Sequence, residues 1–234
     1  ESCLTLEPRG SRPECSHHEQ GPGQNEIDFR YSDPLTAADN AVTFRAVVNS
    51  VAVRNGLAAD FSPKPLADKP GNGMHINISA KSRDGEDVMP RIIAGILSHV
   101  AEMTVFLNTR EESYHRFGSS KAPRYISWSS ESRSQLIRIP AAQGEYRRAE
   151  LRSPDPLCSP YLAFTLLIRA GLDGINRRLV LPDAANVNFY TAPASVRAQF
   201  HTLPETLEDA KTAAAGSDFI AQCLPDSIIR PYTR

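Results

Sequence analysis

The segment from Ser16 to Tyr31, S-H-H-E-Q-G-P-G-Q-N-E-I-D-F-R-Y, constrains the fold most, because its acidic side chains and histidines surround a sequence that cannot be helical. Glu19 and Glu26 are seven residues apart and would share one face of a helix. Gly21-Pro22-Gly23 breaks any helix between them, and on one continuous strand their odd spacing would place them on opposite faces. The two glutamates can therefore converge only across a turn.

Two carboxylates brought together across a turn repel each other unless a cation lies between them, and hard divalent ions such as Mg²⁺ take oxygen ligands. The alternative is a polar loop whose glutamates are solvated. On this segment alone the polar loop is favoured, because H-H-E followed later by a second glutamate has no tight metal-ligand spacing.

The composition is that of an ordinary globular protein, with 234 residues, 41% hydrophobic residues and 23% charged residues, enough for one large domain or two small ones. The net charge of −1 predicts no general attraction to nucleic acid or to anionic membranes. The apolar runs are expected to be too short to span a bilayer, and no signal-peptide pattern opens the sequence, so we expect a cytoplasmic protein. The spacing of the four cysteines favours reduced thiols over a paired metal site or a disulfide scaffold: Cys3, Cys15, Cys158 and Cys223.

Hydrophobic periodicity predicts the helices, and short apolar runs between turn residues predict the strands. A capping-box-like start at Thr36 and a stop at Gly56 predict one helix, and further helices are expected over Pro90–Asn108, Pro160–Arg177, residues 204–215 and residues 217–223. The expected strands are Arg12–His17, Glu26–Arg30, Leu57–Phe61, Met74–Ala80, Tyr125–Trp128, Leu136–Ile139 and Arg147–Leu151.

The predicted fold class is α+β, an antiparallel sheet with helices on its outside, because strands outnumber crossover helices. The glycine-rich segment contains neither of the two common phosphate-binding loop motifs. The opening residues, Glu1 to Arg12, contain Pro8 and Gly10 and resemble the end of a preceding segment rather than the start of a domain.

Three further stretches contain residues of the types that bind ligands or metal ions. In Pro70 to His75, two glycines let the backbone approach a ligand and His75 begins a strand, although a simple turn explains the pattern equally well. In Ser132 to Pro140, Arg133 and Arg138 lie on or beside a short apolar strand, and solvated surface arginines are the alternative.

The third stretch places Arg148, Glu150 and Arg152 on one face of a strand by alternation. Such a row is either a ladder of salt bridges or an anion site beside a metal ligand. Taken together, the stretches supply carboxylates, a histidine and several arginines, which are the components needed to hold ATP phosphates with metal ions.

Seven motifs, in this order, resemble the catalytic domain of bacterial type I glutamine synthetases over about Pro13 to Ile175. They are H-H-E-Q-G-P-G-Q-N-E-I-D-F-R-Y, L-T-A-A-D-N, F-S-P-K-P, G-N-G-M-H, S-R-S-Q-L-I-R-I-P, R-R-A-E-L-R-S-P-D-P and S-P-Y-L-A-F. The resemblance implies a curved antiparallel sheet with outer helices and active sites shared between subunits of a homo-oligomer. It also implies activation of the γ-carboxylate of glutamate by ATP, followed by displacement of phosphate by ammonia.

The resemblance assigns a role to each matching residue. It implies four ligands of Mg²⁺ or Mn²⁺ ions. Glu19 and Glu26 would bind one ion, and His75 and Glu150 would bind a second. Phosphoryl-neutralising arginines are implied at Arg133 and Arg138. Contacts to the amino-acid substrate are implied at Gly71, Arg116 and Arg152, and nucleotide contacts at Tyr31, Ser79 and Arg148.

The departures from the family pattern bear on activity. Lys121 stands where the family's flap has a glutamate that attracts ammonium, and the flap is one residue shorter. Pro70 and Asn77 replace residues that contact the amino acid and the nucleotide. The resemblance implies that residues 1–234 are a C-terminal catalytic domain without the family's small N-terminal domain and its upstream metal-binding strand, so this chain alone is expected to be inactive.

Three functions follow as hypotheses. The first is ligation of ammonia, or another amine, to glutamate with ATP. The second is a non-enzymatic relative that binds nucleotide or serves in assembly, favoured by Lys121 and Pro70. The third, an amino-acid or guanidine phosphotransferase, rests only on the arginines. Glu19, Glu26, His75 and Glu150 favour an enzyme, because their retention argues against decay of the site.

Overall fold

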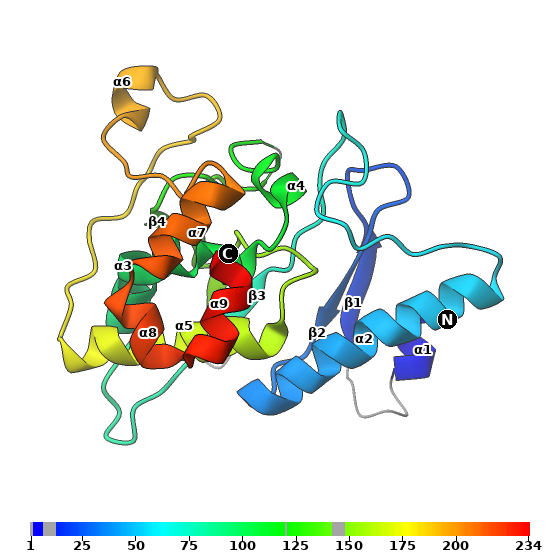
Figure 1. The fold of residues 1–234 in the computed structure, drawn as a ribbon, viewed down its shortest axis with the longest axis horizontal. Coiled ribbons are helices and arrows are strands. Elements are labelled where there is room, and N and C mark those ends of the chain that lie inside the picture. The colour runs from blue at the N-terminus through cyan, green and yellow to red at the C-terminus, as the bar shows by residue number, and fades with distance from the viewer. Residues whose placement is uncertain (1, 7–12, 120, 142–147) are drawn as a thin grey trace. The chain divides into compact units, whose positions relative to one another are not determined.

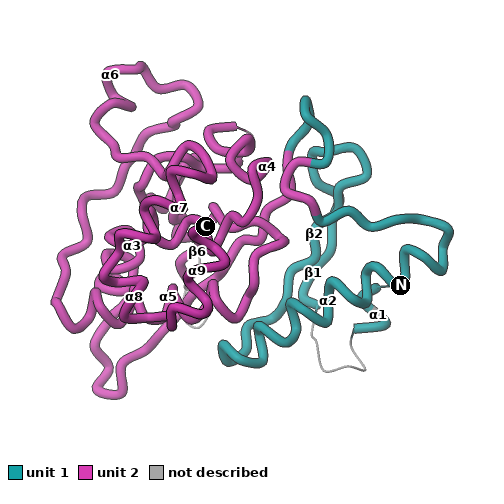
Figure 2. Tube along the Cα trace, in the orientation of Figure 1, with its two compact units in different colours: residues 1–61, 65–70 teal, residues 62–64, 71–234 magenta. Residues whose placement is uncertain are grey.

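The computed structural model describes residues 2–6, 13–119, 121–141 and 148–234, and these fall into two compact units (Figure 2). Unit 1 comprises residues 1–61 and 65–70, and unit 2 comprises residues 62–64 and 71–234. The predictions for Pro8 and Gly10, for Arg12 at the first strand and for Arg147 at the last strand lie outside the described residues.

Unit 1 is a β-hairpin packed against a long helix (Figure 1). It contains α1 (Ser2–Leu6), β1 (Pro13–His18), β2 (Asn25–Phe29) and α2 (Pro34–Arg54). Leu6, Val47 and Val51 form its buried core. Partly buried Phe29 and Phe44 pack against this core, and their rings meet edge to face with centroids 5.2 Å apart. The two strands of the hairpin are antiparallel, as the turn at Gly21-Pro22-Gly23 requires.

The start of α2 differs from the prediction. The helix begins at Pro34, and the carboxylate of Asp33 accepts a hydrogen bond from the backbone N–H of Thr36. Proline at the first helical position has no N–H to leave unsatisfied, and aspartate is a strong capping residue, so this pair sets the start in place of Thr36. The predicted stop is close to the observed end, because α2 ends at Arg54 and Gly56 follows with a positive φ of 69°.

Unit 2 combines a small sheet with helices. Its strands are β3 (Ile76–Ile78), β4 (Trp128–Ser129), β5 (Ile137–Arg138) and β6 (Ala149–Leu151), in the order β3-β6-β5-β4. The β3–β6 and β5–β6 pairs are antiparallel, but β4 pairs with β5 in parallel. The sheet is therefore mixed, and the expectation of a wholly antiparallel sheet is wrong at this edge.

Two long helices form the centre of unit 2, α3 (Met89–Leu107) and α5 (Pro160–Asn176), close to their predicted bounds. They cross at glycines: a Cβ on Gly95 would lie 2.1 Å from the carbonyl oxygen of Ala170, and one on Gly174 would lie 2.1 Å from that of Arg91. The contact admits no side chain at either position. Buried residues of both helices pack with Ile76, Ile137 and Leu151 of the sheet.

Within the described residues, α3 is long and apolar enough to cross a membrane by length and composition, which corrects the expectation that all apolar runs are too short. Most of α3 is buried inside unit 2, as in a core helix.

The remaining helices are short: α4 (Glu111–Tyr114), α6 (Ala194–Arg197), α7 (Leu207–Ala215), α8 (Asp218–Cys223) and α9 (Asp226–Thr233). The predicted helices near residues 204–215 and 217–223 are α7 and α8, whereas α1, α4, α6 and α9 were not predicted. No strand forms over Leu57–Phe61, and Tyr125 makes only an isolated bridge with Thr202. All four cysteines are free, as expected.

Candidate functional site

The hairpin of unit 1 brings Glu19 and Glu26 together, which confirms that the two glutamates converge across the turn. The register places His17 opposite Glu26, and the backbone N–H of Glu19 donates to the carbonyl of Gln24 to close the turn. The imidazole of His17 lies between the carboxylates, with Nδ1 3.8 Å from Glu19 and Nε2 4.0 Å from Glu26. Ligand atoms of the three residues lie within 4.8 Å of one another, a donor set that fits a divalent cation.

The close approach of these carboxylates alters the acidity of Glu26. Burial, the neighbouring charge of Asp28, and the hydrogen bond and charge of Glu19 raise the pKa of Glu26 to about 7, against the opposing effect of His17. Like charges held together in this way favour a shared proton or a bound cation. His17 was not among the predicted ligands, although its position two residues before Glu19 on the same strand face could have indicated it.

In unit 2, Glu150 is the centre of a second cluster. The β-sheet register aligns Asn77, Glu150 and Arg138 on three neighbouring strands. His75, just before β3, places its Nδ1 3.1 Å from Oε1 of Glu150. The side chain of Glu150 is only 10% exposed, so the sheet holds a charged carboxylate largely away from water.

Two arginines hold this carboxylate. Arg152 donates from Nη1 to Oε1 of Glu150 at 2.5 Å, and Arg138 donates from Nη1 to Oε2 at 3.2 Å. Burial opposes ionisation of Glu150, but the hydrogen bond to His75 and the charges of Arg152, His75 and Arg138 together outweigh it and lower its pKa to about 2. Glu150 is therefore an anion at neutral pH.

The arginines around Glu150 retain capacity to bind an anion. The Nε atoms of Arg138 and Arg152 are buried and have no hydrogen-bond partner among the described residues. Arg133 is exposed in the segment between β4 and β5, and its charge acts on the guanidinium of Arg152. Unpartnered buried donors are costly, which makes these atoms suited to a ligand that brings negatively charged oxygens.

Arg148 reaches across to the neighbouring strand, where its Nε donates to Oδ1 of Asn77 at 3.0 Å. Asn77 is the register partner of Glu150, so Arg148 lies on the same face of the sheet as the cluster. The predicted alternation of Arg148, Glu150 and Arg152 is consistent with these contacts.

Arg116 occupies a different environment from the one its predicted role suggests. It is 3% exposed, and its guanidinium donates four hydrogen bonds, to the carbonyls of Asn72, Ser113 and Ser153 and to Oδ1 of Asn108. Burial lowers its pKa to about 10. The side chain ties together three segments of unit 2 that are far apart in the sequence.

Gly71 lies against this arginine. A Cβ at Gly71 would be 2.4 Å from the carbonyl oxygen of Pro63 and 2.9 Å from Cγ and Cδ of Arg116, so no larger residue fits. The backbone N–H of Asn72 donates to the same Pro63 carbonyl. Of the two further predicted nucleotide contacts, Tyr31 in unit 1 is 67% exposed and Ser79 in unit 2 is also exposed.

Lys121 lies in a tight turn next to the Glu150 cluster. The backbone N–H of Gly118 donates to the carbonyl of Ala122, and Lys121 has a positive φ of 70°. The carbonyl of Lys121 accepts a hydrogen bond of 3.3 Å from Nη2 of Arg152. One arginine therefore connects the turn to Glu150.

Glu19 and Glu26 belong to unit 1, and His75 and Glu150 belong to unit 2. The structure brings together the residues of each pair. The approach of the two pairs to each other stays a prediction.

Comparison with known proteins gives one consistent family. The family model for the glutamine synthetase catalytic domain matches residues 1–234. A glutamine synthetase of Methanosarcina mazei is 42% identical over 97% of this chain and 54% of its own length, and one of Thermus thermophilus is 40% identical over 94% and 52%. The chain thus spans about half the length of the curated relatives it matches.

Solved structures agree with the sequence matches. A structure of GmaS in complex with ADP superposes with a TM-score of 0.89 at 29% identity, over 99% of this chain and 57% of that chain. GmaS without ligand superposes with a TM-score of 0.86 at 28% identity.

Proposed function

Because the chain belongs to the glutamine synthetase catalytic-domain family, we propose that the full protein is an ATP-dependent ligase acting on glutamate. In this proposal ATP phosphorylates the γ-carboxylate, and ammonia or a small amine displaces phosphate from the γ-glutamyl phosphate. The observation that carries the proposal is the buried Glu150 with its histidine and two arginines, in a chain that matches the catalytic domain over its whole length.

The charge around Glu150 supports transfer of a phosphoryl group. One carboxylate faces the guanidinium groups of Arg138 and Arg152, and Arg133 adds a third positive charge nearby. Such fixed positive charge stabilises the negative charge that the transferring group carries in the transition state. In this proposal Arg133 and Arg138 neutralise the phosphoryl group, and Arg148 contacts the nucleotide with Tyr31 and Ser79.

The carboxylates and the imidazole fit Mg²⁺ or Mn²⁺. Glu19 and Glu26 would hold one ion, with His17 beside them, and His75 and Glu150 would hold another. A divalent ion bound at such residues supplies positive charge that offsets the charge of the phosphates. The protein's own part is to keep Glu150 ionised and oriented, through its hydrogen bonds with Arg138 and Arg152.

For the amino-acid substrate, the unpartnered Nε of Arg152 can donate a hydrogen bond to a carboxylate, and the backbone at Gly71 is the other proposed contact. Arg116 stays in the proposal as a substrate contact, although four of its N–H groups are already bonded within unit 2. We further propose a homo-oligomer, as the family resemblance implies, with no nucleic acid or membrane partner.

The proposal is tested by assaying the full-length protein with ATP, glutamate, and either ammonium or primary amines. Arg138→Ala should lower kcat by about 100-fold or more, because it removes a charge aimed at the phosphoryl group. Arg197 on α6 is only partly buried and provides the matched control, and Arg197→Ala should leave kcat unchanged.

Binding of ATP without any amine-dependent release of phosphate would overturn the proposal. It would favour the non-enzymatic alternative, to which the replacements at Pro70 and Lys121 point.

A further inference from the structure

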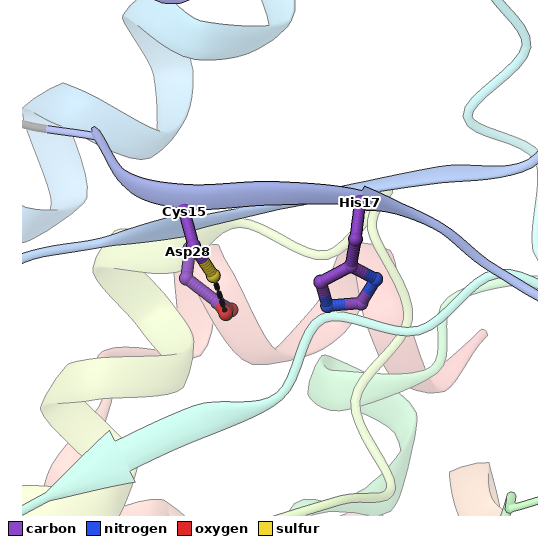
Figure 3. A group of neighbouring side chains, drawn as sticks. All are labelled: Cys15, His17 and Asp28. Atoms are coloured by element: carbon purple, nitrogen blue, oxygen red, sulfur yellow. Dashed lines mark hydrogen bonds between the residues drawn. The ribbon is translucent and has the colours of Figure 1, made fainter.

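The hairpin of unit 1 carries a second group of ligand-type side chains beside the glutamate pair. The register places Cys15 opposite Asp28 and His17 opposite Glu26, and alternation puts Cys15 and His17 on the same face of β1. Figure 3 shows the side chains of Cys15, His17 and Asp28 extending from the same side of the hairpin, with Cys15 donating to Oδ2 of Asp28 at 2.9 Å. One ligand atom from each residue lies within 4.8 Å of the other two.

We propose that Cys15, His17 and Asp28 bind a thiophilic divalent metal ion of the zinc type. Thiolate, imidazole and carboxylate are the three ligand classes that Zn²⁺ takes in proteins, whereas Mg²⁺ and Mn²⁺ favour oxygen ligands over thiolate. Three protein ligands leave the fourth tetrahedral position to water. This site goes beyond the proposed ligase function, since no step of that reaction uses Cys15 or Asp28.

The spacing of the ligand atoms is close to what such an ion requires. With metal–ligand bonds of about 2.0–2.3 Å in a tetrahedral arrangement, ligand atoms are about 3.3–3.8 Å apart. Separations of up to 4.8 Å therefore need only small side-chain rotations. Cys15 and His17 are exposed, so rotation at β1 meets little resistance, and binding replaces the Cys15 to Asp28 hydrogen bond with release of the thiol proton.

His17 belongs both to this group and to the group with Glu19 and Glu26. The two groups differ in chemistry, because the glutamate pair offers oxygen and the Cys15 group offers sulfur. An ion of the zinc type that takes His17 therefore withdraws the imidazole from the glutamate pair. The hairpin distinguishes soft from hard cations at adjacent positions.

The experiment titrates the reduced, chelator-stripped full-length protein with Co²⁺ and with Zn²⁺ in the presence of excess Mg²⁺, which fills oxygen-only sites. Co²⁺ should give a thiolate-to-cobalt charge-transfer band that Zn²⁺ abolishes by displacement. Cys15→Ser should remove the band. His17→Gln and Asp28→Asn should each weaken Zn²⁺ binding by about 10- to 100-fold or more, since even indirect partners of a metal have effects of that size.

Two matched variants control for other thiols and imidazoles. His18 is the exposed neighbour of His17 on β1, and His18→Gln should leave the band and the affinity unchanged, as should Cys223→Ser on α8. Absence of a thiolate band in the wild-type protein would overturn the proposal, as would a band that persists in Cys15→Ser or is lost in Cys223→Ser. The readout needs neither substrate nor turnover, so a failure of the proposed ligase function leaves it intact.

Discussion

Arg116 is the residue at which a structural role and a substrate-binding role can be separated most clearly. Its guanidinium donates four hydrogen bonds from a side chain that is 3% exposed. In Arg116→Lys, one ammonium nitrogen replaces a planar fork and keeps about two of these bonds. Because a hydrogen bond from a charged donor contributes about 1.5–3 kcal/mol, the loss of two should lower the free energy of unfolding by about 3–6 kcal/mol.

The assay is chemical denaturation of the full-length protein at one fixed concentration, with Arg197→Lys as the control. Arg197 is only partly buried on α6, so its substitution should change the free energy of unfolding by about 0.5 kcal/mol or less. The reasoning is refuted if Arg116→Lys costs less than about 1 kcal/mol while the KM for glutamate rises more than about tenfold. Arg116 would then bind the substrate carboxylate in the working protein and contribute little to the fold.

Three further substitutions follow from the same structure. Gly71→Ala places a Cβ 2.4 Å from the Pro63 carbonyl oxygen and should lower stability by about 1–3 kcal/mol in a thermal melt, whereas Gly73→Ala, with no contact under 3.6 Å, should have little effect. Glu150→Gln leaves the buried guanidinium of Arg152 without its counter-charge and should cost about 3–5 kcal/mol by urea denaturation; a loss below 1 kcal/mol would contradict this. Lys121→Glu should raise kcat/KM for ammonium, because one charge about 4 Å from an ammonium is worth roughly 4 kcal/mol at an effective dielectric near 20. An unchanged kcat/KM for ammonium would show that Lys121 does not face the acceptor.

Turn residues, strand alternation and helical periodicity were sufficient to predict the structure where the contacting residues are close in the sequence. The turn at Gly21-Pro22-Gly23 follows from backbone restrictions, and it is what allows Glu19 and Glu26 to meet. Alternation predicted that Glu150 of β6 and Arg152, the residue after β6 ends, share one face, and the observed contact is 2.5 Å. The apolar stripes of α3 and α5 are long enough that their period identifies each helix.

The same sequence patterns failed to predict secondary structure where it depends on contacts with residues far away in the sequence. The apolar run Leu57–Phe61 was predicted as a strand, but the described chain provides no strand to pair with it, and Phe61 packs edge to face on Phe44. Helix α9 was missed because Pro231, a residue that usually ends helices, lies within its last turn.

The four acceptors of Arg116 could not have been foreseen from the sequence either. Two of them, on Asn72 and Ser153, lie 44 and 37 residues from Arg116 in the sequence. Motif matching identified the arginine, but only the folded chain shows what its guanidinium contacts.

The charge balance at Glu150 links metal and nucleotide in the proposed reaction. One carboxylate already faces Arg138 and Arg152, so the cluster carries excess positive charge before any cation binds. Placing a divalent ion against His75 and Glu150 adds two more positive charges to a largely buried site, which is unfavourable unless an anion accompanies it. In the proposed reaction a triphosphate would supply that anion, and Arg138, whose buried Nε has no hydrogen-bond partner among the described residues, would donate to it. If the proposal holds, the same arginines that keep Glu150 ionised would make binding of the second cation depend on binding of the nucleotide.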